Sequence, residues 1–151
     1  MKKLPMVLFF LVFLISACGA SVTNANPSGG VEISAPFANA AAAGQNSAAF
    51  MSIKNTGIET DTLLKASCDD AMMVQVMESK MEGDVVSMDK VPDIELPAGA
   101  TVELKPGGYH IMLMNLKQDV VEGSTLMVTL EFAIAGKITV EVPVIAIGSV
   151  P

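Results

Sequence analysis

Short runs of alternating apolar and polar residues, separated by turn residues, recur along the chain from Val31 onward. A period of two is typical of strands that have one buried face and one face in water. The pattern predicts strands over residues 31–35, 48–54, 60–67, 73–78, 85–88, 101–104, 109–116, 125–132 and 137–147. About nine short strands without a helical period predict one all-β domain, an antiparallel β-sandwich.

Three of these runs also predict which side chains point inward. Residues 125–132 and 138–144 alternate most cleanly and are expected to be the best core strands. In residues 73–78, the two valines fall on one face, and Met73, Gln75 and Met77 fall on the other. The turn residues 82–84 then predict a hairpin that pairs residues 85–88 with this run.

The first 30 residues carry a different pattern. Two lysines, a short apolar run and small residues predict a secretory signal peptide over residues 1–17. The apolar run is shorter than the about 20 residues that a spanning helix needs. Residues 14–18 resemble a bacterial lipobox, which implies that Cys18 is lipidated; in the alternative, an ordinary signal peptide, Cys18 is incidental. Residues 18–30 then form a flexible tether, and residues 31–148 form the folded domain.

Charge and cysteine content narrow the function classes. The formal charge is −7 and the chain has no arginine, which argues against partners such as nucleic acid or an anionic membrane surface. Export places the protein in the periplasm or on the outer face of the cytoplasmic membrane, attached by its lipid anchor. If Cys18 is lipidated, Cys68 has no disulfide partner and is expected to be buried and inert. A secondary role for Cys68 in metal transfer stays open.

The candidate chemistry lies in residues 105–116, which hold the only histidine and the only tyrosine. A Pro-Gly-Gly turn precedes a strand in which His110, Met112 and Met114 share one face. Residues two apart on a strand lie about 7 Å apart at their Cα atoms, close enough for their side chains to share one ion. Imidazole and thioether ligands suit a soft metal. Five further methionines crowd residues 72–88, although methionine also fills irregular cores.

The spacing of these residues resembles the H-x10-M-x21-H-x-M motif of the PCu(A)C family of periplasmic copper chaperones. Met88, His110 and Met112 match its last three ligands, and Met77 stands where the family has its first histidine. The P-G-G-Y-H-I-M-L-M segment, residues 76–79 and the final V-P-V run are also similar to the family, so the resemblance covers residues 31–147.

The resemblance implies a cupredoxin-like sandwich and a Cu(I) metallochaperone with its ligands near the surface at one end. Met77 and Met88 would come from one hairpin, and His110 and Met112 from a later strand. It also implies a role in assembling the CuA centre of cytochrome c oxidase, with the CuA subunit or a Sco-like protein as partner. Methionine at position 77 should favour Cu(I) over Cu(II) further, and Met114 would support the site or act as a secondary ligand.

Other functions fit the residues less well. A blue-copper electron carrier needs two histidines and a cysteine, and the chain has one histidine. No serine or cysteine near His110 in the sequence forms an evident triad, and one histidine is poor for zinc catalysis, so we expect no enzyme. The remaining alternative is a binding or structural lipoprotein in which copper binding has been weakened or lost.

Overall fold

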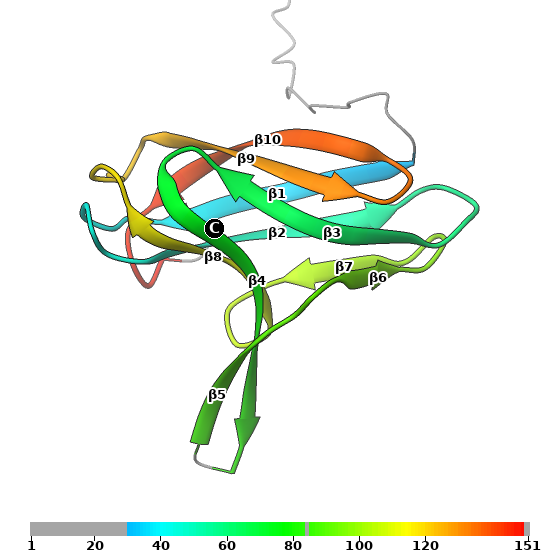
Figure 1. Cartoon of the computed structure of the whole chain (residues 1–151), viewed down its shortest axis with the longest axis horizontal. Helices are drawn as coiled ribbons and strands as arrows, with labels where there is room; N and C mark the ends of the chain where they lie inside the picture. Colours follow the sequence, from blue (N-terminus) through cyan, green and yellow to red (C-terminus); the bar gives the residue numbers. More distant parts are fainter. Residues whose placement is uncertain (1–29, 84, 150–151) are drawn as a thin grey trace, which may run out of the picture.

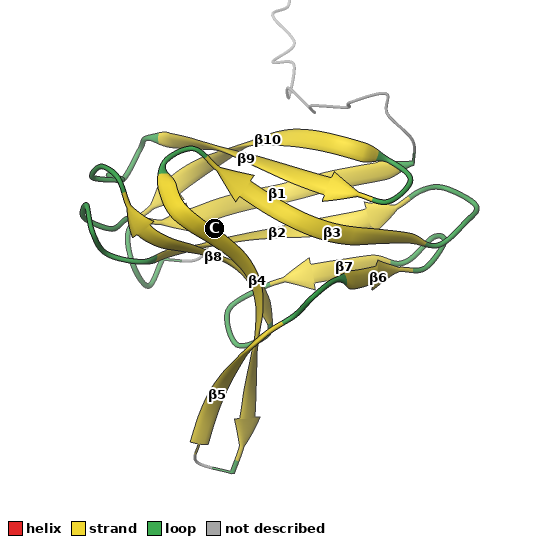
Figure 2. Cartoon of the chain, viewed as in Figure 1, coloured by secondary structure: helices red, strands yellow, loops and turns green. Residues whose placement is uncertain are grey.

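The computed structural model describes residues 30–83 and 85–149, which form strands and turns (Figure 2). The ten strands are β1 (Val31–Asn39), β2 (Ser47–Asn55), β3 (Asp61–Cys68), β4 (Ala71–Glu82), β5 (Val85–Lys90), β6 (Ile94–Leu96), β7 (Thr101–Leu104), β8 (Tyr109–Leu116), β9 (Thr125–Phe132) and β10 (Gly136–Ile145). All nine predicted strands are present. The sequence pattern missed β6, since three residues between prolines are too few to show alternation.

The strands follow the order β5-β4-β8-β7-β2-β1-β10-β9-β3-β6, and β8 also pairs with β2. Strand β1 joins the two layers of the sandwich. It pairs antiparallel with β2 and then runs parallel to β10 through Ala38 and Val144. A bulge between Ser34 and Phe37, with Ala35 at φ 47°, permits this change of partner. The predicted β-sandwich is therefore confirmed. Its pairing is not wholly antiparallel, because β1–β10 and β7–β8 are short parallel pairs.

The core lies between the layers and is built from alternate residues of the strands. On β9, Leu126, Val128, Leu130 and Phe132 are all buried, as the alternation predicts. On β8, Ile111 and Leu113 are fully buried. Because neighbouring residues on these strands point the other way, the pattern that fixes the core also fixes the residues of each outer face.

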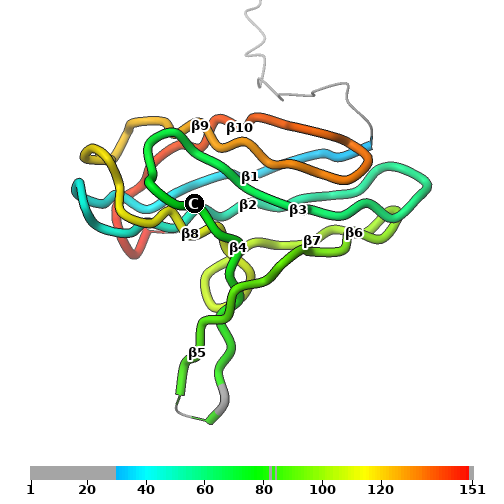
Figure 3. The backbone as a smooth tube through the Cα atoms, viewed as in Figure 1, coloured from blue at the N-terminus to red at the C-terminus, as the bar shows by residue number. Residues whose placement is uncertain are grey.

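The hairpin formed by β4 and β5 extends away from the sandwich (Figures 1 and 3). Strand β4 pairs with β8 from Ala71 to Glu78 and with β5 from Met77 to Glu82. Its first part therefore belongs to the body and its second part to the projection. This confirms the hairpin predicted from the turn residues.

Asp61 fastens the start of β3 to the β9–β10 turn. Its carboxylate accepts hydrogen bonds from the backbone N–H groups of Thr62, Ile134 and Ala135 at 2.7–2.9 Å. Burial alone would raise the pKa of Asp61, but these backbone hydrogen bonds favour the charged form and hold its pKa below the ordinary value.

The predicted signal peptide, the predicted lipid anchor Cys18 and all of the predicted tether except Gly30 lie outside the described residues. Among the residues that are described, the structure contains no helix with the length and apolar character to cross a membrane.

Candidate metal site

The candidate site is built on the pairing of β4 with β8. Three pairs of directly opposite residues follow one another: Met77 with His110, Gln75 with Met112, and Met73 with Met114. Opposite residues of an antiparallel pair share a face. The residues between them, such as Val76 and Ile111, are buried in the core. The three pairs therefore lie on the outer face, as the alternation of both strands predicts.

The hairpin adds Met88 to the same face. Met88 lies opposite Ser79, and Ser79 shares a face with Met77 because the two are two residues apart on β4. Met88 is thus a diagonal neighbour of Met77, at about 7–8 Å between backbones, which long side chains can span. The fold brings Met77, Met88, His110 and Met112 onto one face of three adjacent strands.

Exposure differs strongly among the four side chains. Met88 is 55% exposed, Met77 and Met112 are half-buried, and His110 is 5% exposed. The expectation that all four ligands lie near the surface is therefore wrong for His110. Its ring packs against Phe50, with centroids 6.4 Å apart, and Phe50 packs against Phe37 at 5.0 Å.

These two phenylalanines are buried on the outer face and do not belong to the main core. Phe37 lies opposite Phe50 across β1 and β2. Sequence reasoning missed them, although Phe50 alternates with Ala49 and Met51, both core residues, and so had to point outward. Together they form an apolar wall on one side of the imidazole.

A turn fixes the orientation of the imidazole. Gly108 N–H donates to the Lys105 carbonyl at 3.1 Å, and Gly107 has φ 80°. Proline at position 106 and a glycine with positive φ after it make a type II turn, which explains the Pro-Gly-Gly sequence. The Gly108 carbonyl then accepts hydrogen bonds from Ser79 N–H of β4 and from His110 Nδ1, both at 3.0 Å.

The second of these bonds defines the tautomer of His110. A carbonyl oxygen can only accept, so Nδ1 carries the hydrogen and donates it. In the neutral ring, the lone pair of Nε2 is then left for a metal. This is the arrangement in which a metal-binding histidine is oriented through its other nitrogen.

The donor chemistry is soft. Among the described residues, no group of three or more His, Cys, Asp and Glu side chains could hold a metal ion. The outer face instead offers thioether sulfur and one imidazole, which favour a soft monovalent ion over Ca²⁺, Mg²⁺ or Zn²⁺. Lys90 lies opposite Met77 on the same face and is exposed, so it is the nearest charged residue along that row.

The two secondary candidates occupy different places. Met114 lies half-buried on the same outer face as His110, opposite Met73. Cys68 is buried in the core at the end of β3, opposite Val128. Burial raises the pKa of the Cys68 thiol, so at neutral pH it stays protonated and is a poor metal ligand.

Known proteins resemble this chain in sequence. Residues 31–144 match the model of the family described as "Putative lipoprotein LpqE-like". A curated relative from Leifsonia xyli subsp. xyli (strain CTCB07), "Putative lipoprotein Lxx21020", is 37% identical over 116 residues, which cover 76% of this chain and 69% of that protein.

Two solved structures share the fold. The copper-bound PCuAC domain from PmoF2 has a TM-score of 0.65 and 25% identity, covering 79% of this chain and 95% of that one. The solution structure of CuI-DR1885 from Deinococcus radiodurans has a TM-score of 0.61 and 27% identity, covering 78% and 80%. The chain therefore belongs to the LpqE-like lipoprotein family, and its fold is the cupredoxin-like sandwich of PCuAC domains.

Proposed function

We propose that this protein is an extracytoplasmic chaperone that binds Cu(I) as cargo through Met77, Met88, His110 and Met112. The observation that carries the proposal is the strand register, which places all four side chains on one outer face with the Nε2 lone pair of His110 free. The copper-bound structures among the similar PCuAC domains support the same cargo.

The ligand set explains the choice of oxidation state. Three thioethers and one imidazole are uncharged, so the bound ion keeps its single positive charge. Soft sulfur ligands stabilise Cu(I), whereas Cu(II) prefers nitrogen and oxygen donors. Methionine at position 77, in place of the histidine that the family resemblance implies, shifts this preference further toward Cu(I).

The gradient of exposure suits transfer. Met88 is exposed on the projecting hairpin, and His110 is buried against Phe50. An acceptor can therefore replace Met88 as a ligand before it reaches the imidazole. Exchange of one ligand at a time lets copper pass without release into water.

We further propose that the acceptor is the CuA centre of cytochrome c oxidase, reached directly or through a Sco-like protein. Membership of a lipoprotein family supports export and membrane anchoring, with Cys18 as the proposed anchor. Mixing the Cu(I)-loaded chain with an apo-CuA domain should transfer copper, measured as metal content after separation. No transfer would reject this acceptor while leaving Cu(I) binding intact.

Titration with Cu(I) against a chromophoric Cu(I) chelator tests the site. We expect Met88→Leu and His110→Gln to weaken binding, and the matched control Met127→Leu to leave it unchanged, since Met127 is an exposed methionine of β9. X-ray absorption of the Cu(I) form should show three sulfur ligands and one nitrogen ligand. Unchanged affinity in both site variants would favour a lipoprotein without a copper function.

A further inference from the structure

One cross-strand pair on the outer face is not used by the four-ligand site. Met73 on β4 lies directly opposite Met114 on β8, one row beyond Gln75 and Met112. Side chains directly opposite in an antiparallel pair have Cβ atoms about 4.5–5.5 Å apart. Two flexible thioethers at this separation can bring both sulfur atoms to one ion.

Packing does not account for Met73. Its side chain is 52% exposed, and it lies where β4 pairs with β8 but not yet with β5. A methionine that fills a core gap would be buried, as Met51 is at 2%. Met73 is instead presented to solvent beside a second thioether.

A polar neighbour positions the sulfur. Gln75 Nε2 donates a hydrogen bond to Met73 Sδ at 3.4 Å. A thioether sulfur has two lone pairs, so the second remains for a metal.

We infer that Met73 and Met114 form a second binding position for a soft monovalent ion, Cu(I) or Ag(I), next to the four-ligand site. With two thioethers and no imidazole it binds more weakly than that site. Met112 stands between the two positions, two residues from both Met114 and His110 on β8. An ion at the Met73–Met114 pair can thus exchange one sulfur ligand for Met112 Sδ and move toward His110, with no electron or proton transferred.

The second position rests on the proposed Cu(I) function and takes the same ion as the four-ligand site, so the experiment must separate the two positions. The probe is Ag(I), a redox-inert substitute for Cu(I), added to the full chain labelled with ¹³C at the methionine methyl groups. We expect the methyl signals of Met77, Met88 and Met112 to shift with the first equivalent. The signals of Met73 and Met114 should shift only at higher Ag(I), and Met127 should not shift.

Two variants distinguish the failures. Met73→Leu, which leaves the secondary candidate Met114 in place, should abolish the second phase and leave the first unchanged. Met77→Leu/Met88→Leu should abolish the first phase and leave shifts at Met73 and Met114. Leucine conserves volume, so both variants should fold. Met72→Leu removes a methionine that is more exposed, at 67%, than Met73 at 52%, and should alter neither phase.

The experiment can reject either binding position while the other stands. If Met73 and Met114 do not shift, or shift only in parallel with Met72 and Met127, the second position is rejected and the four-ligand site stands. If Met77, Met88 and Met112 do not shift while Met73 and Met114 do, the four-ligand site is rejected and the second position stands.

Discussion

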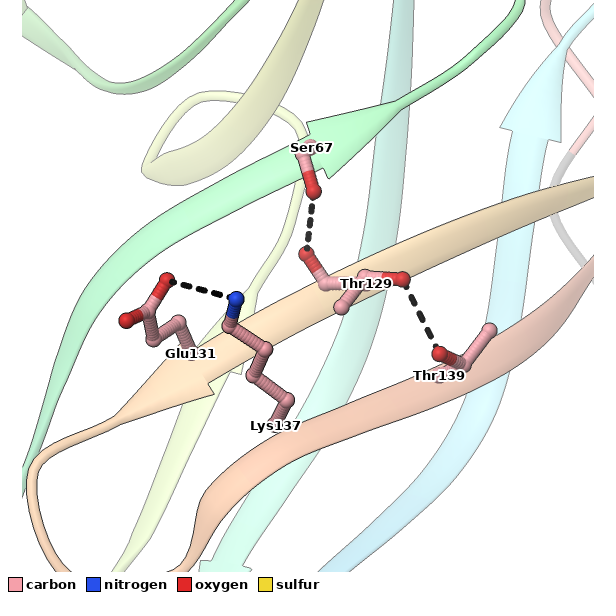
Figure 4. A network of polar contacts seen from close by, with 5 residues as sticks. All are labelled: Ser67, Thr129, Glu131, Lys137 and Thr139. Carbon is pink, nitrogen blue, oxygen red and sulfur yellow. Dashed lines mark hydrogen bonds and ion pairs between the residues drawn. The ribbon is translucent and has the colours of Figure 1, made fainter.

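The two outer faces of the sandwich follow the same alternation but carry different chemistry. The face of β3, β9 and β10 is polar: Thr129 and Thr139 share a hydrogen bond at 2.9 Å, Ser67 donates to the Thr129 carbonyl at 3.5 Å, and Lys137 lies 4.0 Å from Glu131 (Figure 4). The face of β4, β5 and β8 carries thioethers and one imidazole in the corresponding outward positions.

This contrast shows what the fold requires and what it leaves free. Hydroxyl and charged groups satisfy one another or water on a solvent face and add little stability individually. Thioethers form no comparable interactions with water. Methionines are concentrated on the face of β4, β5 and β8, whereas on the strands of the other face β9 carries Met127. This uneven distribution indicates that the exposed methionines serve ligand binding and not folding.

The largest expected effect is at the histidine. His110→Gln removes the only imidazole, and Cu(I) affinity should fall by at least about 100-fold, because changes even in the outer shell of metal sites cost about 10–100-fold. Thr139→Val, on the polar face, is the matched control and should leave affinity unchanged. Chelator competition measures both, and far-UV circular dichroism checks that both variants fold. Equal affinity in the two variants would contradict the site.

On the other layer, Asp61→Asn should lower the free energy of unfolding by about 1–3 kcal/mol, because buried backbone donors lose a charged acceptor. The pKa of Asp61 is lowered in the folded state, so the carboxylate contributes stability above the pKa of the unfolded chain. That contribution is lost as pH falls through the lower folded value, below the ordinary 3.8.

Urea unfolding between neutral and strongly acidic pH tests this, and the Asn variant should show less acid sensitivity than wild type. Its Cu(I) affinity at neutral pH should match wild type, since Asp61 lies in the other layer. An altered affinity would mean that the two layers are coupled.

Met77→His should change the oxidation state of the copper that the site retains, and it should leave the fold unchanged. A second imidazole gives Cu(II) a nitrogen ligand, so we expect the variant to retain Cu(II) under conditions in which wild type does not. Electron paramagnetic resonance after gel filtration detects the bound Cu(II). Thr129→His supplies a histidine on the polar face as control and should retain none. Equal Cu(II) retention in both variants would contradict the assignment of Met77 to the site.

The polar face itself should tolerate change. The double variant Thr129→Val/Thr139→Val removes one exposed hydrogen bond and keeps β-branched side chains, so stability should change by no more than about 1 kcal/mol. Thermal unfolding gives this value. A loss several times larger would show that this face does more than shield the core.

The smallest effect is expected at Lys90, the exposed cation opposite Met77. Lys90→Gln removes repulsion toward a bound cation and should tighten Cu(I) binding by up to about fivefold at low salt. The gain should vanish in high salt because exposed charges are screened. Lys137→Gln, on the polar face, should have no effect at either salt concentration.

Alternation predicted most of the fold and the face of the sheet on which the candidate ligands lie. A period of two fixes the face to which each side chain points once a strand is recognised. It placed Met73, Gln75 and Met77 outward, and His110 with Met112 and Met114. It could not give the pairing of β4 with β8, since register depends on contacts distant in sequence. For this reason the pairing of Met73 with Met114 and the acceptor role of Gly108 appeared only in the structure.

Burial on the outer face also escaped sequence reasoning. His110 occupies an outward position and is nevertheless buried, because Phe50 and Phe37 stack beside it. Alternation predicts the face of the sheet to which a side chain points. It does not predict whether neighbouring side chains shield that side chain from solvent. The short strand β6 was missed for a different reason, because pairing of Ile94 with Leu63 and of Leu96 with Asp61 defines it more than its own three residues do.

The hydrogen bond from His110 to Gly108 also gives the protein an intrinsic spectroscopic signal of metal binding. Since the chain has one histidine, a ¹⁵N spectrum of the imidazole contains the signals of a single ring. In the neutral ring Nδ1 carries the hydrogen and Nε2 does not, so the two signals of the neutral apo form should lie far apart. Metal binding at Nε2 should move one of them and spare the other. Cargo loading and delivery can thus be followed in real time without an added dye.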